Sequence, residues 1–227
     1  MKKLFIKLAK ALGYEIIDQN NFVSPTLEKK LNEDLSYFNE SSIVLPLGEV
    51  KITRKITSLL IIFRTNTSVE IWDQNKKRLF EFPKIEYATR SLNSLIRSIK
   101  YLKQKFPKID LKLIILDDNS KKKNLELIKR VSQFEESSEI ISLDLNKYKS
   151  LIKEQKSLET FSNLSSLLNS FEIGKNRGED LVFFVEDDYL HFETMLEEML
   201  SSFQRISSQL NKDIFMCPAD YPYLYMN

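Results

Sequence analysis

The chain has 227 residues, 42% of them hydrophobic and 29% charged, so it can bury the core of one good-sized domain. Thirty-four basic residues against 32 acidic ones leave a formal net charge of +2, which argues against a nucleic-acid-binding protein. A single cysteine excludes an internal disulfide, and four glycines outside any G-x-G-x-x-G or Walker pattern argue against glycine-cradled dinucleotide and ATP sites.

The first element in chain order is a basic segment, residues 1–14. Its apolar residues fall at helical spacing and its four lysines precede any acid, which predicts a basic amphipathic helix. Such a helix can attach weakly to an anionic membrane surface. The alternative is a helix packed on the domain with its lysines in solvent. No apolar run approaches the roughly 18 residues of a membrane span.

Residues 15–57 have a mixed pattern. Residues 18–25 are rich in turn formers, residues 26–38 suit a helix, and residues 43–56 alternate like one or two short strands broken near Pro46 and Gly48. We interpret this stretch as an N-terminal extension that leads into the main domain.

From residue 58 onward the chain alternates between strand-like and helix-like segments. The expected strands are 58–63, 111–116, 139–143, 181–185 and 213–217, and the expected helices are 87–106, 124–134, 151–173 and 192–210. This alternation predicts an α/β fold with a mostly parallel sheet. Ligands of such sheets bind beyond the carboxyl ends of the strands.

An acidic cluster, Glu186-Asp187-Asp188, directly follows the apolar run 181–185. If the chain stays extended, Glu186 and Asp188 lie on one side and Asp187 on the other. One side suits a hard divalent cation, and the other suits a hydroxyl or an amide. The alternative is an acidic loop that caps the helix beginning near Phe192.

A second acidic turn, Asp117-Asp118-Asn119-Ser120, follows the run 111–116. On its own it also fits an ordinary helix N-cap. It gains significance because it lies at the end of a strand of the same predicted sheet as the acidic cluster.

The order of these motifs resembles a GT-A glycosyltransferase, particularly of the family 2 type. One strand runs into Arg64-Thr65-Asn66, a second into ILDDNS (115–120), and a third into FVEDDY (184–189), where the acids match a DXD-type motif. The resemblance covers residues 58–227. It implies a Rossmann-like sheet flanked by helices, behind a short N-terminal helical extension, and a nucleotide-sugar donor.

The resemblance also implies roles for individual residues. Asp118 contacts the nucleotide base, and Asp188 binds a Mn²⁺ or Mg²⁺ ion. Glu186 and Asp187 contact the ribose or the metal. Arg64 and Thr65 belong to the first donor contact, although an arginine at a strand end also pairs readily with an acid.

The chain departs from the family pattern in two places. It ends before the region from which family members usually take their catalytic base, so Asp220, the one acid beyond Asp213, is the candidate base by elimination. The domain 58–227 is therefore expected to be either C-terminally incomplete or minimal. The first strand also ends differently from the family pattern, and an insertion with Trp72 and basic residues 76–78 follows it.

Two isolated residues have simpler interpretations. His191 is expected near the start of a helix, in partial solvent, rather than in a metal shell. Cys217 is expected to be a small buried hydrophobe.

The resemblance implies a metal-dependent glycosyltransferase, and with the basic N-terminal helix it predicts a protein of the cytoplasm, peripheral on the inner face of the cell membrane. Its expected acceptor is a surface glycan or a lipid-linked molecule, and no nucleic acid is expected as a partner. The alternative is a non-catalytic nucleotide-sugar-binding module or scaffold. A nucleotidyltransferase is disfavoured, because the glycine-rich basic loop after the first strand is missing.

Overall fold

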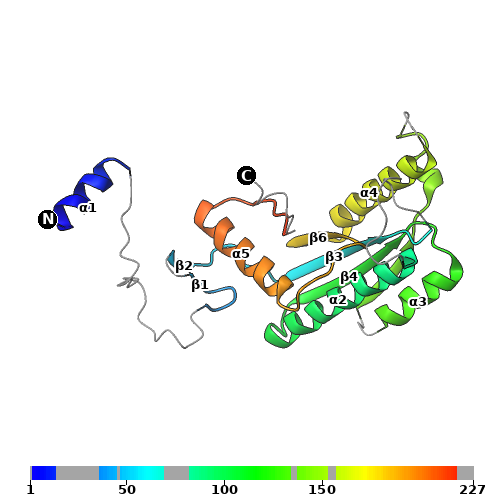
Figure 1. The fold of residues 1–227 in the computed structure, drawn as a ribbon, viewed down its shortest axis with the longest axis horizontal. Helices are drawn as coiled ribbons and strands as arrows, with labels where there is room; N and C mark the ends of the chain where they lie inside the picture. Colours follow the sequence, from blue (N-terminus) through cyan, green and yellow to red (C-terminus); the bar gives the residue numbers. More distant parts are fainter. Residues whose placement is uncertain are drawn as a thin grey trace. The chain divides into compact units, whose positions relative to one another are not determined.

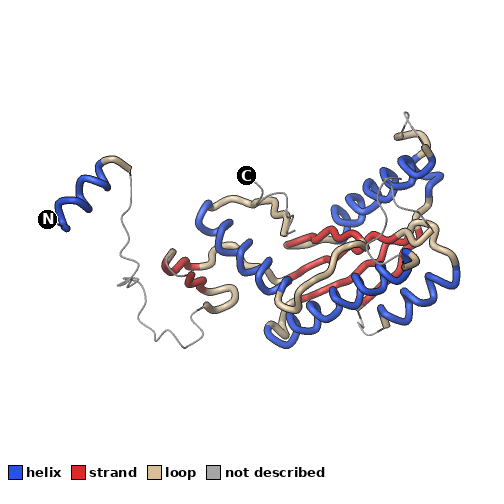
Figure 2. The backbone as a smooth tube through the Cα atoms, in the orientation of Figure 1, coloured by secondary structure: helices blue, strands red, loops and turns tan. Residues whose placement is uncertain are grey.

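The computed structural model describes residues 2–13, 36–44, 47–68, 82–133, 137–152 and 157–218 (Figures 1 and 2). The chain divides into two compact units. The smaller unit combines Met1–Lys55 with Phe203–Met216, and the larger unit combines Ile56–Ser202 with Cys217–Asn227.

The smaller unit contains a helix, a hairpin and the end of a second helix. Helix α1 spans Lys2–Ala11, and strands β1 (Ser41–Val44) and β2 (Gly48–Lys51) pair antiparallel. Helix α5 (Met195–Leu210) contributes its second half. There the buried Arg205 donates to the carbonyl oxygens of Ser42 and Gly48 at 2.7 and 3.0 Å, which attaches the hairpin to the helix.

The predicted helix over residues 26–38 lies mostly outside the described residues, and its last three residues are not helical. Of the one or two short strands predicted over residues 43–56, two are present, β1 starting two residues earlier than predicted. Gly48, the first residue of β2, has a φ of 79°, which suits glycine. Among the described helices, none combines the length and apolar character needed to cross a membrane.

The larger unit is built on a four-stranded parallel sheet. Its strands are β3 (Ser58–Thr65), β4 (Asp110–Asp117), β5 (Ser138–Ser142) and β6 (Leu181–Glu186), in the order β5-β4-β3-β6. All three neighbouring pairs are parallel. The predicted α/β class with a mostly parallel sheet is confirmed, and the strand order is consistent with a Rossmann-like GT-A type.

Helices cover both faces of this sheet. Helices α2 (Lys84–Lys105) and α3 (Lys122–Ser132) pack together on one face, and α4 (Leu158–Arg177) covers the other (Figure 1). A short 3₁₀ helix, η1 (Leu145–Tyr148), precedes α4. Ser157 caps the start of α4, because its hydroxyl accepts from the backbone N–H of Thr160 at 3.2 Å.

The two central strands, β3 and β4, are largely apolar on both faces because both faces are covered. Along β3, Leu60 and Ile62 pack with Ile114 of β4 and Ile173 of α4 in one cluster. The alternate residues of β3 point to the opposite face, where α2 lies. Helix α2 buries an apolar stripe that includes Leu92, Leu95 and Ile99.

Two expectations near the end of the chain are wrong. Residues 213–217 form no strand in the described structure, and Phe215 is fully exposed. A short apolar run becomes a strand only where a neighbour completes its ladder of hydrogen bonds. Among the described residues, 213–217 have no such neighbour, and Asp213 pairs instead with Arg54. Cys217 is likewise exposed, because no strand carries it into a core.

The strand order creates a switch point between β3 and β6. From β3 the chain moves to β4 and β5 on one side, and it then returns to place β6 on the other side of β3. At such a point the two connections leave the sheet in opposite directions and open a crevice at the carboxyl ends of the strands. The topology therefore makes the residues at the carboxyl ends of β3 and β6 the candidate ligand-binding residues.

Candidate functional site at the carboxyl edge of the sheet

The end of β3 lies between the two acidic strand ends predicted from the sequence. Thr65 of β3 pairs with Asp117 of β4, and Arg64 pairs with Glu186 of β6. The backbone N–H of Asp118 donates to the carbonyl oxygen of Thr65 at 2.8 Å. The two acidic motifs thus lie on either side of one strand end, although they are far apart in sequence.

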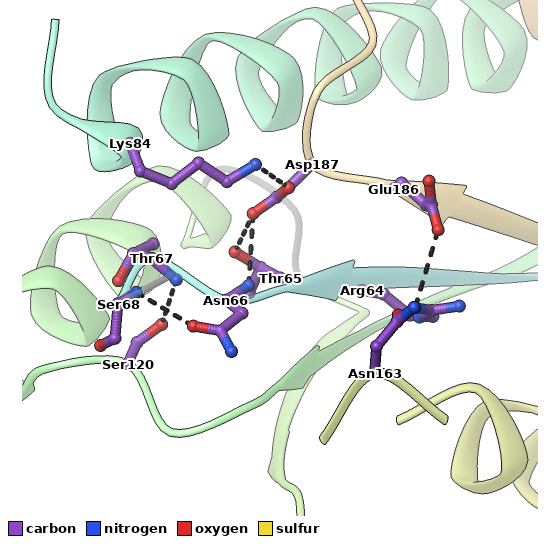
Figure 3. Close-up of polar contacts among 10 residues, drawn as sticks. All are labelled: Arg64, Thr65, Asn66, Thr67, Ser68, Lys84, Ser120, Asn163, Glu186 and Asp187. Carbon is purple, nitrogen blue, oxygen red and sulfur yellow. Dashed lines mark hydrogen bonds and ion pairs between the residues drawn. The ribbon is translucent and has the colours of Figure 1, made fainter. Parts of the chain in front are cut away.

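Exposure alternates along the acidic cluster, although the strand ends at Glu186 and residues 187 and 188 form a turn. Glu186 and Asp188 are exposed, whereas Asp187 is buried. The Oδ2 atom of Asp187 accepts from the Thr65 hydroxyl at 2.8 Å and from the backbone N–H of Asn66 at 3.3 Å (Figure 3). These are the hydroxyl and amide partners that suit an inward-facing carboxylate, and they join β6 to β3.

The other oxygen of Asp187 faces a lysine that the sequence analysis did not single out. The Nζ atom of Lys84 lies 2.5 Å from Oδ1 of Asp187 (Figure 3). Lys84 is the first residue of α2, where the helix dipole disfavours a positive charge, so the ion pair compensates for that position. Pro83 immediately before it is a helix-start signal that could have located α2 three residues earlier.

Asp118 is buried and lies between the end of β3 and helix α4. Its Oδ2 atom accepts from the side-chain amide of Asn66 at 3.0 Å and from the Ser162 hydroxyl at 2.5 Å. Its Oδ1 atom is also buried and has no hydrogen-bond partner among the described residues. A buried carboxylate oxygen without a donor is costly, so this atom calls for a ligand or a solvent molecule.

Asp117 is a second buried acid, and one of its carboxylate oxygens also lacks a hydrogen-bond partner among the described residues. Its Oδ2 atom accepts from the backbone N–H of Ser120 at 3.1 Å, whereas Oδ1 has no partner in the described part of the chain. Burial raises the pKa of Asp117, and the Ser120 hydrogen bonds oppose that rise. The Ser120 hydroxyl in turn accepts from the backbone N–H of Thr67 at 3.0 Å, which fixes the turn after β3 (Figure 3).

Arg64 lies on the opposite face of the sheet from Lys84. Its guanidinium donates to Oδ1 of Asn163 in α4 at 2.6 Å and lies 3.6 Å from Oε1 of Glu186 (Figure 3). Burial lowers the pKa of Arg64, and the charges of Glu186, Asp187 and Asp118 oppose that shift. Each face of the β3–β6 junction therefore carries one cation beside one acid.

Asp188, like Glu186, is an exposed acid of the cluster. Desolvation by the surrounding chain still raises the pKa of Asp188, and the ammonium of Lys84 opposes that rise. No group of three or more His, Cys, Asp or Glu residues in the described structure could hold a metal ion. A hard divalent ion can nevertheless bind through one or two carboxylates when phosphate oxygens complete its shell. Exposed Asp188 fits such an ion.

His191 stays outside this set of contacts. Its side chain is half-buried, and its Nε2 atom is buried without a partner among the described residues. Burial lowers the pKa of His191 to about 4, so the imidazole is neutral at pH 7. The expected candidate base, Asp220, lies outside the described residues, as do Trp72 and residues 76–78.

The structure brings the other predicted site residues together at one edge of the sheet. They are Arg64, Thr65, Asp118, Glu186, Asp187 and Asp188. Fold and site together define a protein of the α/β class with a parallel sheet and an acidic site at its topological switch point.

Comparisons with known proteins add little to this definition. No protein-family model matches the chain, and no curated protein matches it. Among solved structures, a crystal structure of an active-site mutant of LgtC is similar, with a TM-score of 0.32 and 13% sequence identity. That match covers 58% of this chain and 38% of the LgtC chain. A similarity this distant does not establish a function for this chain.

Proposed function

We propose that this protein is a glycosyltransferase that uses a nucleotide-sugar donor. In this proposal, the nucleotide-sugar binds across the carboxyl ends of β3, β4 and β6, and its sugar is transferred to a surface glycan or a lipid-linked acceptor. Residues 58–227 form the donor-binding domain, behind the helix of residues 1–14 and the extension of residues 15–57.

The unpartnered oxygen of Asp118 is the observation that supports this proposal most. Asp118 is 4% exposed, and its Oδ1 atom lacks a donor among the described residues. A ring N–H or an exocyclic amino group of a nucleobase is a donor of the required kind. The Asn66 amide and the Ser162 hydroxyl hold the carboxylate in place to accept it.

The exposed carboxylates at the end of β6 suit the diphosphate end of the donor. Asp188, together with Glu186 of the same cluster, would hold a Mn²⁺ or Mg²⁺ ion whose other ligands are phosphate oxygens. Such an ion supplies Lewis-acid stabilisation of the charge that develops on the leaving diphosphate. The guanidinium of Arg64 adds positive charge on the α4 side of the same strand end.

The remaining residues orient the site. Thr65 and the backbone of Asn66 hold Asp187, and this contact fixes the ends of β3 and β6 relative to each other. In the proposal, Asp220 removes the proton from the acceptor hydroxyl as that oxygen attacks the anomeric carbon.

We also propose that α1 attaches the protein to the inner surface of the cell membrane, where lipid-linked acceptors are found. The exposure of Phe5, Leu8 and Leu12 supports this, because one apolar stripe of the helix is open. Four lysines in the same segment suit an anionic lipid surface.

Thermal unfolding with a panel of nucleotide-sugars, with and without Mn²⁺, tests the donor site. A donor at about 100 times its dissociation constant should stabilise the wild type by about 2.7 kcal/mol. We expect one donor to raise the unfolding temperature of the wild type in the presence of Mn²⁺. Both Asp118→Asn and Asp188→Asn should lose most of this rise in unfolding temperature. Asp110→Asn, at the opposite end of β4, is the matched control and should keep it.

The outcomes separate the possible functions. Transfer or slow hydrolysis of the stabilising donor would support the enzyme. A metal-dependent shift without any turnover would support the non-catalytic binding module instead. A folded wild type that responds to no nucleotide-sugar would contradict both.

A further inference from the structure

A lysine of helix α2, Lys84, places a positive charge against the acidic cluster Glu186-Asp187-Asp188. Three adjacent carboxylates repel one another, and burial of one of them makes the repulsion stronger. Asp187, the buried member, is 7% exposed, and Lys84 reaches it from the first turn of α2 (Figure 3). The ammonium lies 2.5 Å from Oδ1 of Asp187, and the two side chains are 19% and 9% exposed.

Both oxygens of Asp187 are therefore engaged by the chain itself. Oδ2 accepts from Thr65 and from the backbone of Asn66, and Oδ1 faces the ammonium. The ammonium thus engages Oδ1, the oxygen that Asp187 would otherwise have free for a cation. Glu186 is also partly engaged, because the guanidinium of Arg64 lies 3.6 Å from it.

We propose that Lys84 is the resident cation of the acidic cluster and keeps Asp187 from binding divalent metal ions. Asp188 and Glu186 then hold a metal only weakly until a nucleoside diphosphate supplies the missing oxygen ligands. This inference rests on the proposed donor site, and it makes metal and donor bind as a pair. Lys84 is thus a positioning residue for the cluster.

Removal of the ammonium is expected to have an unusual effect. Asp187 would keep its burial but lose its ion-pair partner, which is a costly state for a carboxylate. A divalent ion can relieve that state by entering the vacated position, with Asp188 close by. Lys84→Ala should therefore bind Mn²⁺ alone more tightly than the wild type, even though the substitution itself weakens the fold.

The test is the affinity for Mn²⁺ alone, measured from the electron paramagnetic resonance signal of the free ion. We expect Lys84→Ala to bind at least about tenfold more tightly than the wild type, consistent with one added carboxylate ligand. Lys84→Arg keeps a cation and should resemble the wild type. Lys84→Ala/Asp187→Asn should lose the gain, and Lys105→Ala, at the far end of α2, should change nothing.

A purely structural role for Lys84 predicts a different result. Lys84→Ala would then be less stable, and its Mn²⁺ affinity would be equal to or lower than that of the wild type, which would overturn the inference. If Lys84→Ala does not fold, Lys84→Gln serves instead, because it removes the charge while an amide can still donate to Asp187.

A second arm adds UDP, GDP, CDP, ADP or dTDP to the wild type. One nucleotide should raise the affinity for Mn²⁺ at least about tenfold, because its phosphates complete the metal shell. Nucleotide binding without the Lys84→Ala gain would overturn the role of Lys84 and leave the proposed function standing. The gain without binding of any nucleotide would support Lys84 as the cation of the cluster and contradict the proposed function.

Discussion

Asp187, Asp117 and Asp118 are all buried at one edge of the sheet, yet their carboxylates are satisfied to different degrees. Asp187 has donors on both oxygens. Asp117 and Asp118 each keep one buried oxygen without a partner among the described residues. A carboxylate that is fully paired within the chain holds elements together, whereas one with a spare acceptor is suited to a ligand. This difference separates the structural acid of the site from the candidate binding acids.

The burial of His191 predicts how the stability of the protein depends on pH. Burial lowers its pKa from 6.5 to about 4 in the folded state. Between these values the unfolded chain binds more protons than the folded one, so stability falls as the pH decreases through this window. We expect the wild type to lose about 2 to 3 kcal/mol more than His191→Phe between pH 7 and about pH 4.5.

Urea unfolding of both proteins across this pH range measures the difference. His191 is the one histidine of the chain, so no other imidazole contributes, and the carboxylates titrate alike in both proteins. If the stability of the two proteins changed with pH in the same way, the folded state would not lower the pKa of His191, which would contradict the prediction.

The junction between α4 and β6 shows how close packing positions an element. Helix α4 ends at Arg177, and Gly178 follows with an ordinary φ of −76°. Conformational freedom is therefore not the reason for a glycine there. A Cβ on Gly178 would lie 2.4 Å from Cγ2 of Val182 and 2.6 Å from the carbonyl oxygen of Gly174. The end of α4 packs so closely on β6 that only a glycine leaves enough space.

Gly178→Ala should consequently destabilise the protein by about 1 to 3 kcal/mol, because one of the two contacts is with a backbone oxygen that cannot move aside cheaply. Lys175→Ala, in the exposed last turn of the same helix, is the control and should stay within about 0.5 kcal/mol of the wild type. Urea unfolding at pH 7 measures both, and a loss below 0.5 kcal/mol for Gly178→Ala would mean that β6 can shift freely against α4.

At the scale of the whole molecule, the two compact units carry different surfaces. The larger unit holds the acidic site at the carboxyl edge of its sheet. The smaller unit includes α1, whose Phe5, Leu8 and Leu12 are exposed. In the proposed function, these two surfaces serve different partners: the acidic site binds the soluble donor, and the basic helix binds a lipid surface.

A vesicle-binding experiment tests α1. We expect the protein to sediment with vesicles that contain phosphatidylserine, and Leu8→Asp to weaken this binding at least about tenfold by placing a charge in the apolar stripe. Added salt should also weaken it, because the lysines act through screened charge. Leu158→Asp places the same charge on an exposed position of α4 and should bind like the wild type. Equal binding of all three proteins would exclude α1 as the attachment site.

The sequence alone determined the kind and order of most elements. The apolar runs of β3, β4 and β6 and the periodic stripe of α2 predicted the parallel sheet and its helices, because burial on two faces or one stripe leaves a local pattern. A period of two set Asp187 apart from Glu186 and Asp188, and Asp187 is the buried member, although it lies in a turn and not in a continued strand. The strand predicted over residues 213–217 was wrong, because a strand needs a pairing partner as well as apolar residues.

Only the tertiary structure decided which strand ends meet and which cation accompanies which acid. The sequence does not state that β6 returns to the free side of β3, although this placement joins Thr65 to Asp187. It likewise gives no local signal that Lys84 pairs with an acid 103 positions further along the chain. Side-chain periodicity acts over a few residues, whereas these contacts depend on the path of the chain between distant strands.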